Sequence, residues 1–180
     1  MVELLDTVFK EHGLGEINAD DCLPAWFTGV SELTYVRPDV IPALQALRAG
    51  GLRLGLVSNT AWPASAHDPD LEKFGLRDLL DYRVYSCDVG WEKPAPQIFH
   101  IALSGLGTRP EETAFVGDFR RYDIAGAHGV GMKGILKVVE GRPADLDDPS
   151  VVPDAIIKSI GELPGVLGDL YGWNLEAIQV

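Results

Sequence analysis

The stretch Phe115-Val116-Gly117-Asp118-Phe119-Arg120-Arg121-Tyr122-Asp123 decides the fold, because it joins an apolar run to two aspartates that lie five residues apart. The apolar run over residues 113–116 has the length and composition of a buried strand. The pattern over residues 123–128 predicts a helix that Gly129 ends. We expect Gly117 to permit a tight backbone turn after the strand. A strand, a polar loop and a helix in this order are typical of an α/β sheet, in which ligands bind beyond the carboxyl ends of the strands.

The same alternation continues on both sides of this stretch. Short apolar runs predict further strands over residues 52–57, 82–86, 133–139 and 155–157. Helical spacing of apolar residues predicts helices over residues 39–48, 70–80 and 94–104, and another after residue 157. Because strands that alternate with helices are joined by right-handed crossovers, the fold class is α/β with a mostly parallel sheet.

The charge balance narrows the range of functions. The 180 residues include 15 Lys and Arg against 27 Asp and Glu, which gives a formal net charge of −12. Since phosphate backbones and anionic membranes are bound by basic surfaces, we expect neither nucleic acid nor a membrane as a partner. A local pocket can still oppose the overall sign and bind one small anion.

The cysteine content and the hydropathy are typical of a cytoplasmic protein. Only Cys22 and Cys87 occur, which fits a reducing compartment without a disulfide framework. No apolar run reaches the roughly 18 residues of a membrane span. Residues 1–20 lack the long apolar stretch of a signal peptide. We therefore expect a cytoplasmic location.

Polar groups follow two of the earlier predicted strands. Ser58-Asn59-Thr60 ends the first strand, where a hydroxyl and backbone N–H groups at a helix start suit an anionic oxygen. The same residue types also favour a helix cap or a turn. Lys93 can aim its ammonium group at an anion held over the sheet, although lysine is most often a solvated surface residue. We expect Pro94, directly after it, to lie in the first turn of the next helix.

The third polar strand end holds Asp118 and Asp123. Two carboxylates near one strand end make a hard-oxygen site that suits Mg²⁺, an ion that keeps several waters when a protein binds it. The alternative is a pair of capping aspartates, with Asp123 at the head of its helix. His67 lies in the loop after Thr60, where it could reach a substrate at the mouth of the site. A packed or surface histidine is the competing interpretation.

Taken together and in this order, the three strand ends resemble the haloacid dehalogenase (HAD) superfamily of aspartate-nucleophile phosphohydrolases, from about Arg37 to the C-terminus. Residues 54–59 are similar to its second motif, and residues 92–99 to its third. Residues 116–118, 123–127 and 131–132 are similar to its fourth. The resemblance implies a three-layer, Rossmann-like parallel sheet as an α/β core over residues 37–180. The acidic fourth motif favours the Mg²⁺-dependent phosphatase branch over the metal-free dehalogenase branch.

The resemblance also implies a role for each residue. Ser58 and Asn59 would bind the phosphoryl group of a small phosphorylated substrate, Asn59 through its side chain or its backbone N–H. Lys93 would offset charge on the phosphate and on the nucleophile. Asp118 would bind Mg²⁺, and Asp123 would complete the acidic site or orient Lys93. Lys93 and Asp123 are therefore the candidate catalytic residues, and these roles agree with a reaction in which positioning and charge neutralisation dominate.

The superfamily's first motif, Asp-x-Asp at the end of the central first strand, is not found upstream of Ser58. Its first aspartate is the nucleophile and its second the general acid and base. Residues 1–36 instead resemble the end of a helical cap, so we expect a cap remnant over residues 1–36. We also expect a core that lacks its usual first central strand and either closes up or exposes backbone edges.

Three interpretations follow from the missing motif. In the first, the chain is a fragment, a mis-started gene or a degenerate homologue that has little or no phosphatase activity but retains a phosphate and Mg²⁺ half-site. In the second, it is a non-catalytic interaction module whose missing strand comes from another chain, either a strand-donating partner or a second copy in a homo-oligomer. The third is a dehalogenase or a phosphonate-type hydrolase. Turnover by the dehalogenase would be insensitive to a chelator.

Overall fold

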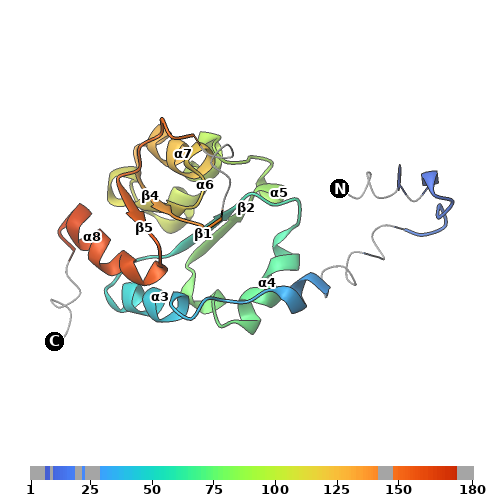
Figure 1. Cartoon of the computed structure of the whole chain (residues 1–180), viewed down its shortest axis with the longest axis horizontal. Coiled ribbons are helices and arrows are strands. Elements are labelled where there is room, and N and C mark those ends of the chain that lie inside the picture. Colours follow the sequence, from blue (N-terminus) through green and yellow to red (C-terminus); the bar gives the residue numbers. More distant parts are fainter. Residues whose placement is uncertain (1–6, 9, 19–21, 23–28, 142–147, 174–180) are drawn as a thin grey trace.

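The computed structural model describes residues 7–8, 10–18, 22, 29–141 and 148–173 (Figure 1). The expected cap remnant over residues 1–36 therefore lies largely outside the described residues. Residues 7–8 and 10–18 are exposed and lie away from the α/β core in all three views. A short helix over residues 29–33 lies nearer to the core, and Lys73 Nζ donates a 2.9 Å hydrogen bond to the carbonyl of Ser31 in it.

Strands and helices alternate along the rest of the chain. The strands are β1 (Gly55–Ser58), β2 (Tyr82–Tyr85), β3 (Ala114–Gly117), β4 (Lys133–Lys137) and β5 (Ala155–Ile157). The main helices are α3 (Val40–Ala49), α4 (Ala64–Lys73), α5 (Ser86–Val89), α6 (Pro96–Leu106), α7 (Ala125–Gly129) and α8 (Leu163–Tyr171). A five-residue π-helical turn, Arg120–Ile124, precedes α7. The α/β fold class predicted from the sequence is confirmed.

The strands form two separate parallel sheets. One sheet pairs β1 with β2, from Gly55 opposite Tyr82 to Ser58 opposite Tyr85. The other has the order β3-β4-β5. Within the ranges given above, no strand joins β1 to β3. Among the described residues, the two half-sheets have not closed into one. That the core lacks its usual first central strand stays a prediction.

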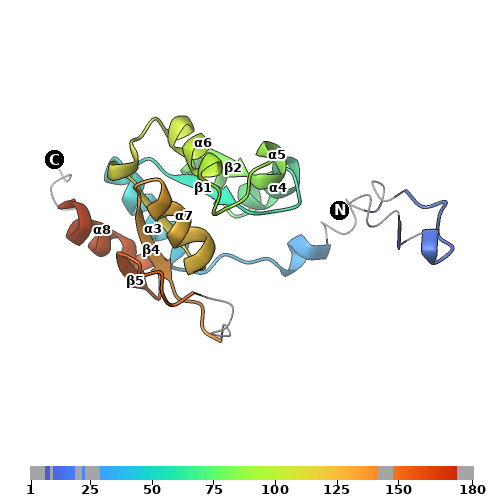
Figure 2. The same cartoon turned by 90° about the horizontal axis from the view of Figure 1, so that it is seen from above.

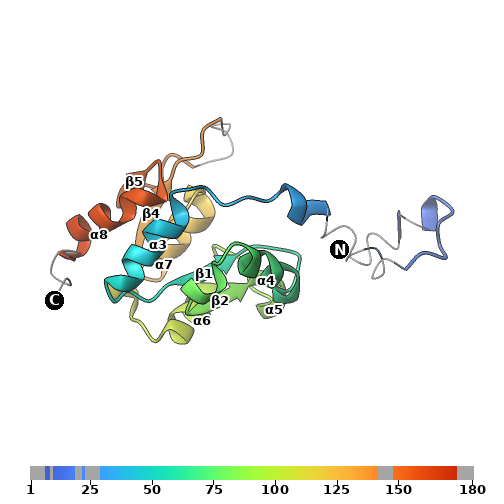
Figure 3. The same cartoon turned by 90° about the horizontal axis from the view of Figure 1, so that it is seen from below.

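Helices cover the strands on both faces, which makes three layers. On one face, α6 and α7 contribute Ile98, Phe99 and Ala127 to a buried cluster that also contains Val84 of β2. On the other face, Leu47 of α3 and Leu163 of α8 pack with Ile135 and Ile157. Figure 2 shows α7 in front of the strands, and Figure 3, from the opposite side, shows α3 in front of them. No helix in the described part of the chain is long and apolar enough to cross a membrane.

One helix differs from the prediction. The sequence predicts a helix over residues 70–80, but α4 covers Ala64–Lys73 and a 3₁₀ turn, Arg77–Leu79, follows it. The start of α4 is stabilised from far along the chain, because Asp88 Oδ2 accepts the N–H of Ala64 at 3.0 Å. Since this cap comes from a distant residue and Pro69 lies inside the helix, the local sequence gives no clear start signal.

Asp154 links α7, β4 and the start of β5. Its carboxylate lies 2.8 Å from each of three partners, namely His128 Nε2, Lys133 Nζ and the N–H of Gly134. Burial opposes the ionisation of Asp154, but hydrogen bonds from Lys133, Gly134 and His128 outweigh burial and lower its pKa from 3.8 to about 2. The ionised carboxylate therefore stabilises the fold above about pH 4, and this contribution is lost as the pH falls through about 2.

We predict that Asp154→Asn lowers the free energy of unfolding at pH 7 by about 1–2 kcal/mol, because charge-assisted hydrogen bonds are replaced by neutral ones. Urea unfolding at a series of pH values measures this. The deficit should shrink between pH 4 and pH 2, where the wild type loses the same contribution. The matched control is Glu111→Gln, which alters an exposed ion pair and should change stability little. A deficit that is constant with pH would contradict the assignment.

Candidate active site

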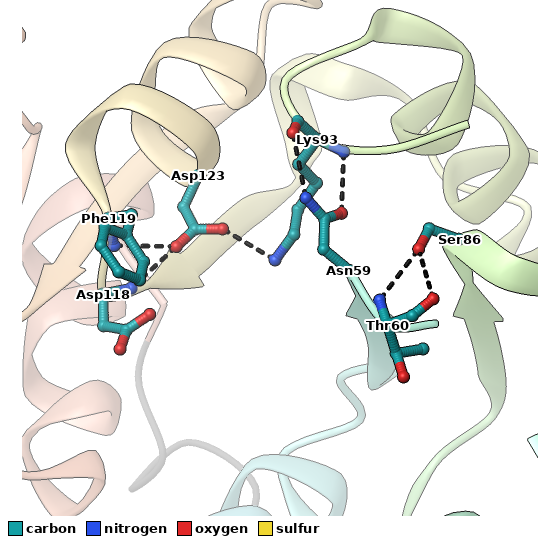
Figure 4. Close-up of polar contacts among 7 residues, drawn as sticks. All are labelled: Asn59, Thr60, Ser86, Lys93, Asp118, Phe119 and Asp123. Carbon is teal, nitrogen blue, oxygen red and sulfur yellow. Dashed lines mark hydrogen bonds and ion pairs between the residues drawn. The ribbon is translucent and has the colours of Figure 1, made fainter. Parts of the chain in front are cut away.

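The carboxyl ends of β1, β2 and β3 lie on the same side of the molecule and supply one group of polar residues (Figure 4). The segment after β1 contributes Asn59 and Thr60, and Ser86 follows β2. The loop after β3 contributes Asp118, and Asp123 lies in the π-helical turn. Lys93, from the loop between α5 and α6, lies between the two sheets.

Asp123 is the most enclosed of these residues, with 3% of its surface exposed. Its Oδ1 accepts a 2.8 Å hydrogen bond from Lys93 Nζ. Its Oδ2 accepts the N–H groups of Asp118 and Phe119, both at 2.9 Å. Both carboxylate oxygens are thus used by donors of the protein, and this satisfaction allows a charged group to be buried. Asp123 is paired with Lys93, and a role in orienting Lys93 for catalysis stays a prediction.

Gly117 serves the site by its lack of a side chain. The expected reason for this glycine was a tight backbone turn, but its φ is not in the left-handed region. A Cβ atom at this position would overlap the carboxyl group of Asp123. The glycine therefore provides the space in which Asp123 reaches the N–H groups after β3.

Lys93 is held at both its ends. Its backbone N–H donates to Asn59 Oδ1 at 2.8 Å, and its carbonyl accepts from Asn59 Nδ2 at 3.0 Å. Its side chain is 13% exposed, and Nζ lies 5.3 Å from the centre of the Phe115 ring. The interpretation of Lys93 as a solvated surface residue is therefore wrong.

Pro94 lies in a turn and not in the first helical turn as expected, because Pro96 takes that position in α6.

The side chain of Asn59 is committed to the backbone of Lys93 by these two hydrogen bonds. Of the two ways in which Asn59 could bind a phosphoryl group, only its backbone N–H does not require these bonds to break. Ser58, the last residue of β1, is half-buried, and its hydroxyl makes no hydrogen bond to another described residue. The hydroxyl of Ser58 is thus available at the strand end, as anion binding there requires.

Ser86, which the sequence did not single out, and His67 stabilise the loop after β1. Ser86 Oγ accepts the N–H of Thr60 at 2.9 Å and donates to the carbonyl of Thr60 at 3.0 Å. Thr60 Oγ1 lies 3.0 Å from His67 Nε2, and the ring of His67 stacks on Tyr85 with centroids 5.0 Å apart. Burial raises the pKa of Tyr85. His67 thus packs against the loop, which favours a structural role for it.

The carboxylates of this site fit a weakly held magnesium ion. Asp118 is half-buried at the carboxyl end of β3, and its oxygens are hard donors. Asp123 would have to give up hydrogen bonds from Lys93 or from two backbone groups in order to bind a metal directly. No group of three potential metal ligands occurs among the residues placed in the structure. One carboxylate completed by waters and a phosphate oxygen is a common way in which proteins bind Mg²⁺.

This arrangement presents a cation, a hydroxyl and a carboxylate around the carboxyl ends of parallel strands. The cation and the hydroxyl suit a small anion, and the carboxylate suits a divalent metal that bridges to the anion. No Asp-x-Asp segment lies upstream of Ser58, where the resembled family carries its nucleophile. The residue types at this edge are thus those that suit a phosphate group and a metal.

A comparison of the sequence with models of known protein families shows the family to which the chain belongs. A model of the haloacid dehalogenase-like hydrolases matches residues 3–131. The chain therefore belongs to the haloacid dehalogenase-like hydrolases. The match begins upstream of Arg37, where the resemblance in motifs starts.

Several of the curated relatives are phosphatases. The chain is 37% identical over 144 residues to a glyceraldehyde 3-phosphate phosphatase of Methanopyrus kandleri, covering 78% of this chain and 60% of that protein. It is 33% identical over 149 residues to a phosphoglycolate phosphatase of Escherichia coli K12, covering 81% and 56%. The chain thus spans about half the length of the curated relatives it matches.

Solved structures show the same fold. A HAD phosphatase from Thermococcus onnurineus superposes with a TM-score of 0.65 and 27% identity, covering 91% of this chain and 86% of that chain. A 2-haloacid dehalogenase from Pseudomonas syringae superposes with a TM-score of 0.70 and 28% identity, covering 88% and 63%. The Rossmann-like core predicted from the resemblance is therefore confirmed.

We predict that Asp123→Asn lowers the free energy of unfolding by about 3 kcal/mol, because the substitution leaves buried Lys93 without its counter-charge. Asp118→Asn, which changes a half-buried carboxylate on the same loop, should cost less than about 1 kcal/mol. Chemical denaturation of both variants measures the difference. Equal losses would mean that Asp123 does not hold the loop as described.

Proposed function

We propose that the chain carries the phosphate and metal half-site of a phosphatase that acts on small phosphomonoesters with Mg²⁺. The observation that supports this most strongly is the Lys93–Asp123 ion pair, which holds a cation over the carboxyl ends of β1 and β3. The same edge of the fold carries Ser58 and Asp118. The two phosphatase relatives act, by their names, on small phosphorylated metabolites. A cytoplasmic location is part of this proposal and rests on the two unpaired cysteines, Cys22 and Cys87.

Each residue has a defined role in this proposal. The hydroxyl of Ser58 and the backbone N–H of Asn59 donate to phosphoryl oxygens. Lys93 neutralises negative charge on the phosphoryl group, and Asp123 fixes the direction in which its ammonium group points. These are positioning and electrostatic roles, which account for most of the catalysis of phosphoryl transfer.

Asp118 is the residue that would hold Mg²⁺. When bound, the ion would neutralise charge on the phosphate oxygens and help to orient the group. Since Asp118 and Lys93 flank the same strand ends, the carboxylate would attract the metal while the ammonium group attracts the anion. Residues 1–36 are proposed to be a remnant of a helical cap.

The 180-residue chain by itself is proposed to turn over phosphate esters very slowly. Aspartyl-phosphate chemistry needs a nucleophilic carboxylate close to the phosphorus atom. No Asp-x-Asp precedes Ser58, and Asp123 is occupied by Lys93 and two backbone N–H groups. Asp118, the remaining carboxylate of the loop, is assigned to the metal.

We predict that p-nitrophenyl phosphate with Mg²⁺ is hydrolysed by this chain at a rate close to that in buffer. Steady-state release of p-nitrophenol measures it, with Asp118→Asn as the matched variant. Robust turnover that Asp118→Asn abolishes would contradict the assignment of a half-site and would require a nucleophile elsewhere in the chain.

We also predict that the chain binds inorganic phosphate in the presence of Mg²⁺, and that Lys93→Met weakens this binding by about tenfold through the loss of one charge-assisted contact. Isothermal titration calorimetry measures the affinity. Lys133→Met is the control, because Lys133 pairs with Asp154 away from the site. Equal weakening by both variants would indicate binding to net charge and not to the site.

A second candidate function is a non-catalytic interaction module that is completed by a strand from another chain. The division of the strands into β1-β2 and β3-β4-β5 favours it. Unpaired sheet edges are templates for strand addition. This candidate and the phosphatase half-site are compatible, because they use different atoms of the same region.

A further inference from the structure

β2 leaves one of its two edges without a neighbouring strand. It pairs only with β1 among the strands that the structure defines. Alternate residues of an edge strand direct their N–H and carbonyl groups away from the sheet, where another extended segment can pair with them. None of the residues of β2 is a proline, which would block such pairing. The backbone of this outer edge is therefore able to accept a strand.

A cavity of about 240 Å³ lies along this outer edge. Its lining includes all of residues 81–85 together with Asp88 and Val89 of α5 and Ile101 of α6. None of the candidate phosphate and metal residues lines it. Pockets that enclose a drug-sized ligand usually have volumes above roughly 300 Å³. A smaller cavity that follows the edge of a strand instead matches a site at which an extended peptide is added to a sheet.

α4 lies on one side of β2 and α6 on the other (Figures 1 and 3). The α4 side of the edge is polar. Tyr85 stacks there on His67 of α4 with ring centroids 5.0 Å apart. Arg83 Nε lies 3.4 Å from Asp68 Oδ1, which also belongs to α4. Asp88 Oδ2 accepts the first N–H of α4 at 3.0 Å. The carboxylate of Asp88 thus lies on the α4 side, just beyond the carboxyl end of β2.

Asp88 is the carboxylate of this cavity whose charge is not balanced by the chain. Asp81, at the other end of β2, pairs with Arg48 at 2.8 Å. Asp68 pairs with Arg83. Asp88 is exposed and forms no ion pair with another residue that the structure describes. The α4 side of the edge therefore presents one net negative charge, close to the end of the strand.

The α6 side of the same edge is apolar. Val84 is buried in the cluster that α6 and α7 form with β2, and Val89 and Ile101 pack against that cluster. The ring of Tyr82 lies so close to Gly105 of α6 that a Cβ atom on the glycine would overlap it. A strand added to this edge would thus meet apolar side chains on one of its faces and the Asp88 carboxylate on the other.

We propose that the outer edge of β2 binds an extended segment of a basic protein partner, in which basic residues alternate with apolar ones. Successive side chains of a strand point to opposite faces. The apolar residues of the segment would therefore meet Val89 and Ile101, while a lysine or arginine lies beside Asp88. β2 is four residues long, so the paired part of the segment is about as long.

The occupant is a different protein and not a second copy of this chain. Two copies would bring together two chains of net charge −12, which repel each other. A basic partner has the opposite sign, which favours its approach to the acidic chain as well as the local contact with Asp88. This inference involves neither phosphate nor Mg²⁺, so its failure would leave the proposed phosphate half-site unaffected.

The test uses the full 180-residue chain and a short synthetic peptide in which valine and lysine alternate between terminal serines. The matched control peptide has the same composition, but its valines and its lysines are grouped. The alternating peptide should slow amide hydrogen exchange at one or more of residues 82–85 by at least about tenfold. The grouped peptide should not. Equal protection by both peptides would show binding to net charge and overturn the proposal, as would no protection by either.

A protein variant tests the role of Asp88. Asp88→Asn removes the charge but keeps a side-chain oxygen that can accept the first N–H of α4. It should weaken binding of the alternating peptide by about threefold at low salt, since an exposed ion pair contributes little more. Fluorescence anisotropy of a labelled peptide measures the affinity. The matched control is Asp78→Asn, an exposed aspartate outside the cavity lining, which should leave the affinity unchanged. Equal effects of the two substitutions would contradict the proposal.

Two further outcomes would place the interaction elsewhere. Protection confined to residues 155–157 would put the peptide on the outer edge of the other sheet. A stable dimer that protects residues 82–85 without any peptide would identify a second copy of the chain as the occupant. Either result would overturn the proposal.

Discussion

The ion pair between Lys93 and Asp123 is the interaction on which the candidate site depends. The two half-sheets share no backbone hydrogen bond among the described residues, and the apolar contacts of the helix layers do not fix how one half-sheet is oriented relative to the other. The hydrogen bonds from Asn59 through Lys93 to Asp123 fix that orientation. They relate the loop after β1 to the loop after β3 over distances of 2.8–3.0 Å. A buried ion pair by itself contributes little net stability, but it fixes geometry when its remaining groups are satisfied, and those of Asp123 are.

The function follows from where this pair lies. A buried ammonium group at the carboxyl ends of parallel strands opposes the overall charge of −12 at one place, so a small anion can bind to a protein that repels anions elsewhere. The proposed function gives that anion a chemical identity, namely a phosphate ester. In the resembled fold one central strand carries the acidic first motif, which would account both for the absence of Asp-x-Asp upstream of Ser58 and for the division of the described strands into two sheets.

Much of the fold could be predicted because short strands and their following polar residues are local features. The strands ending at Ser58 and Gly117 were predicted within a residue or two at their ends, and the candidate residues Asn59, Lys93, Asp118 and Asp123 were found from motif order. Contacts between residues that are far apart in the sequence could not be predicted. Ser86 supports Thr60 from 26 residues away, and the start of α4 depends on Asp88, so no local pattern reports either. For Gly117 the sequence indicated the right residue but the wrong cause, because the space required by Asp123 is a tertiary constraint.

The most direct test of the account is a crystal structure of the chain grown with Mg²⁺ and inorganic phosphate. The account predicts phosphate between the hydroxyl of Ser58 and the ammonium group of Lys93, with the metal on Asp118 and with the Lys93–Asp123 hydrogen bond intact. Phosphate bound elsewhere, or Lys93 turned away from Asp123 when the anion is present, would contradict it.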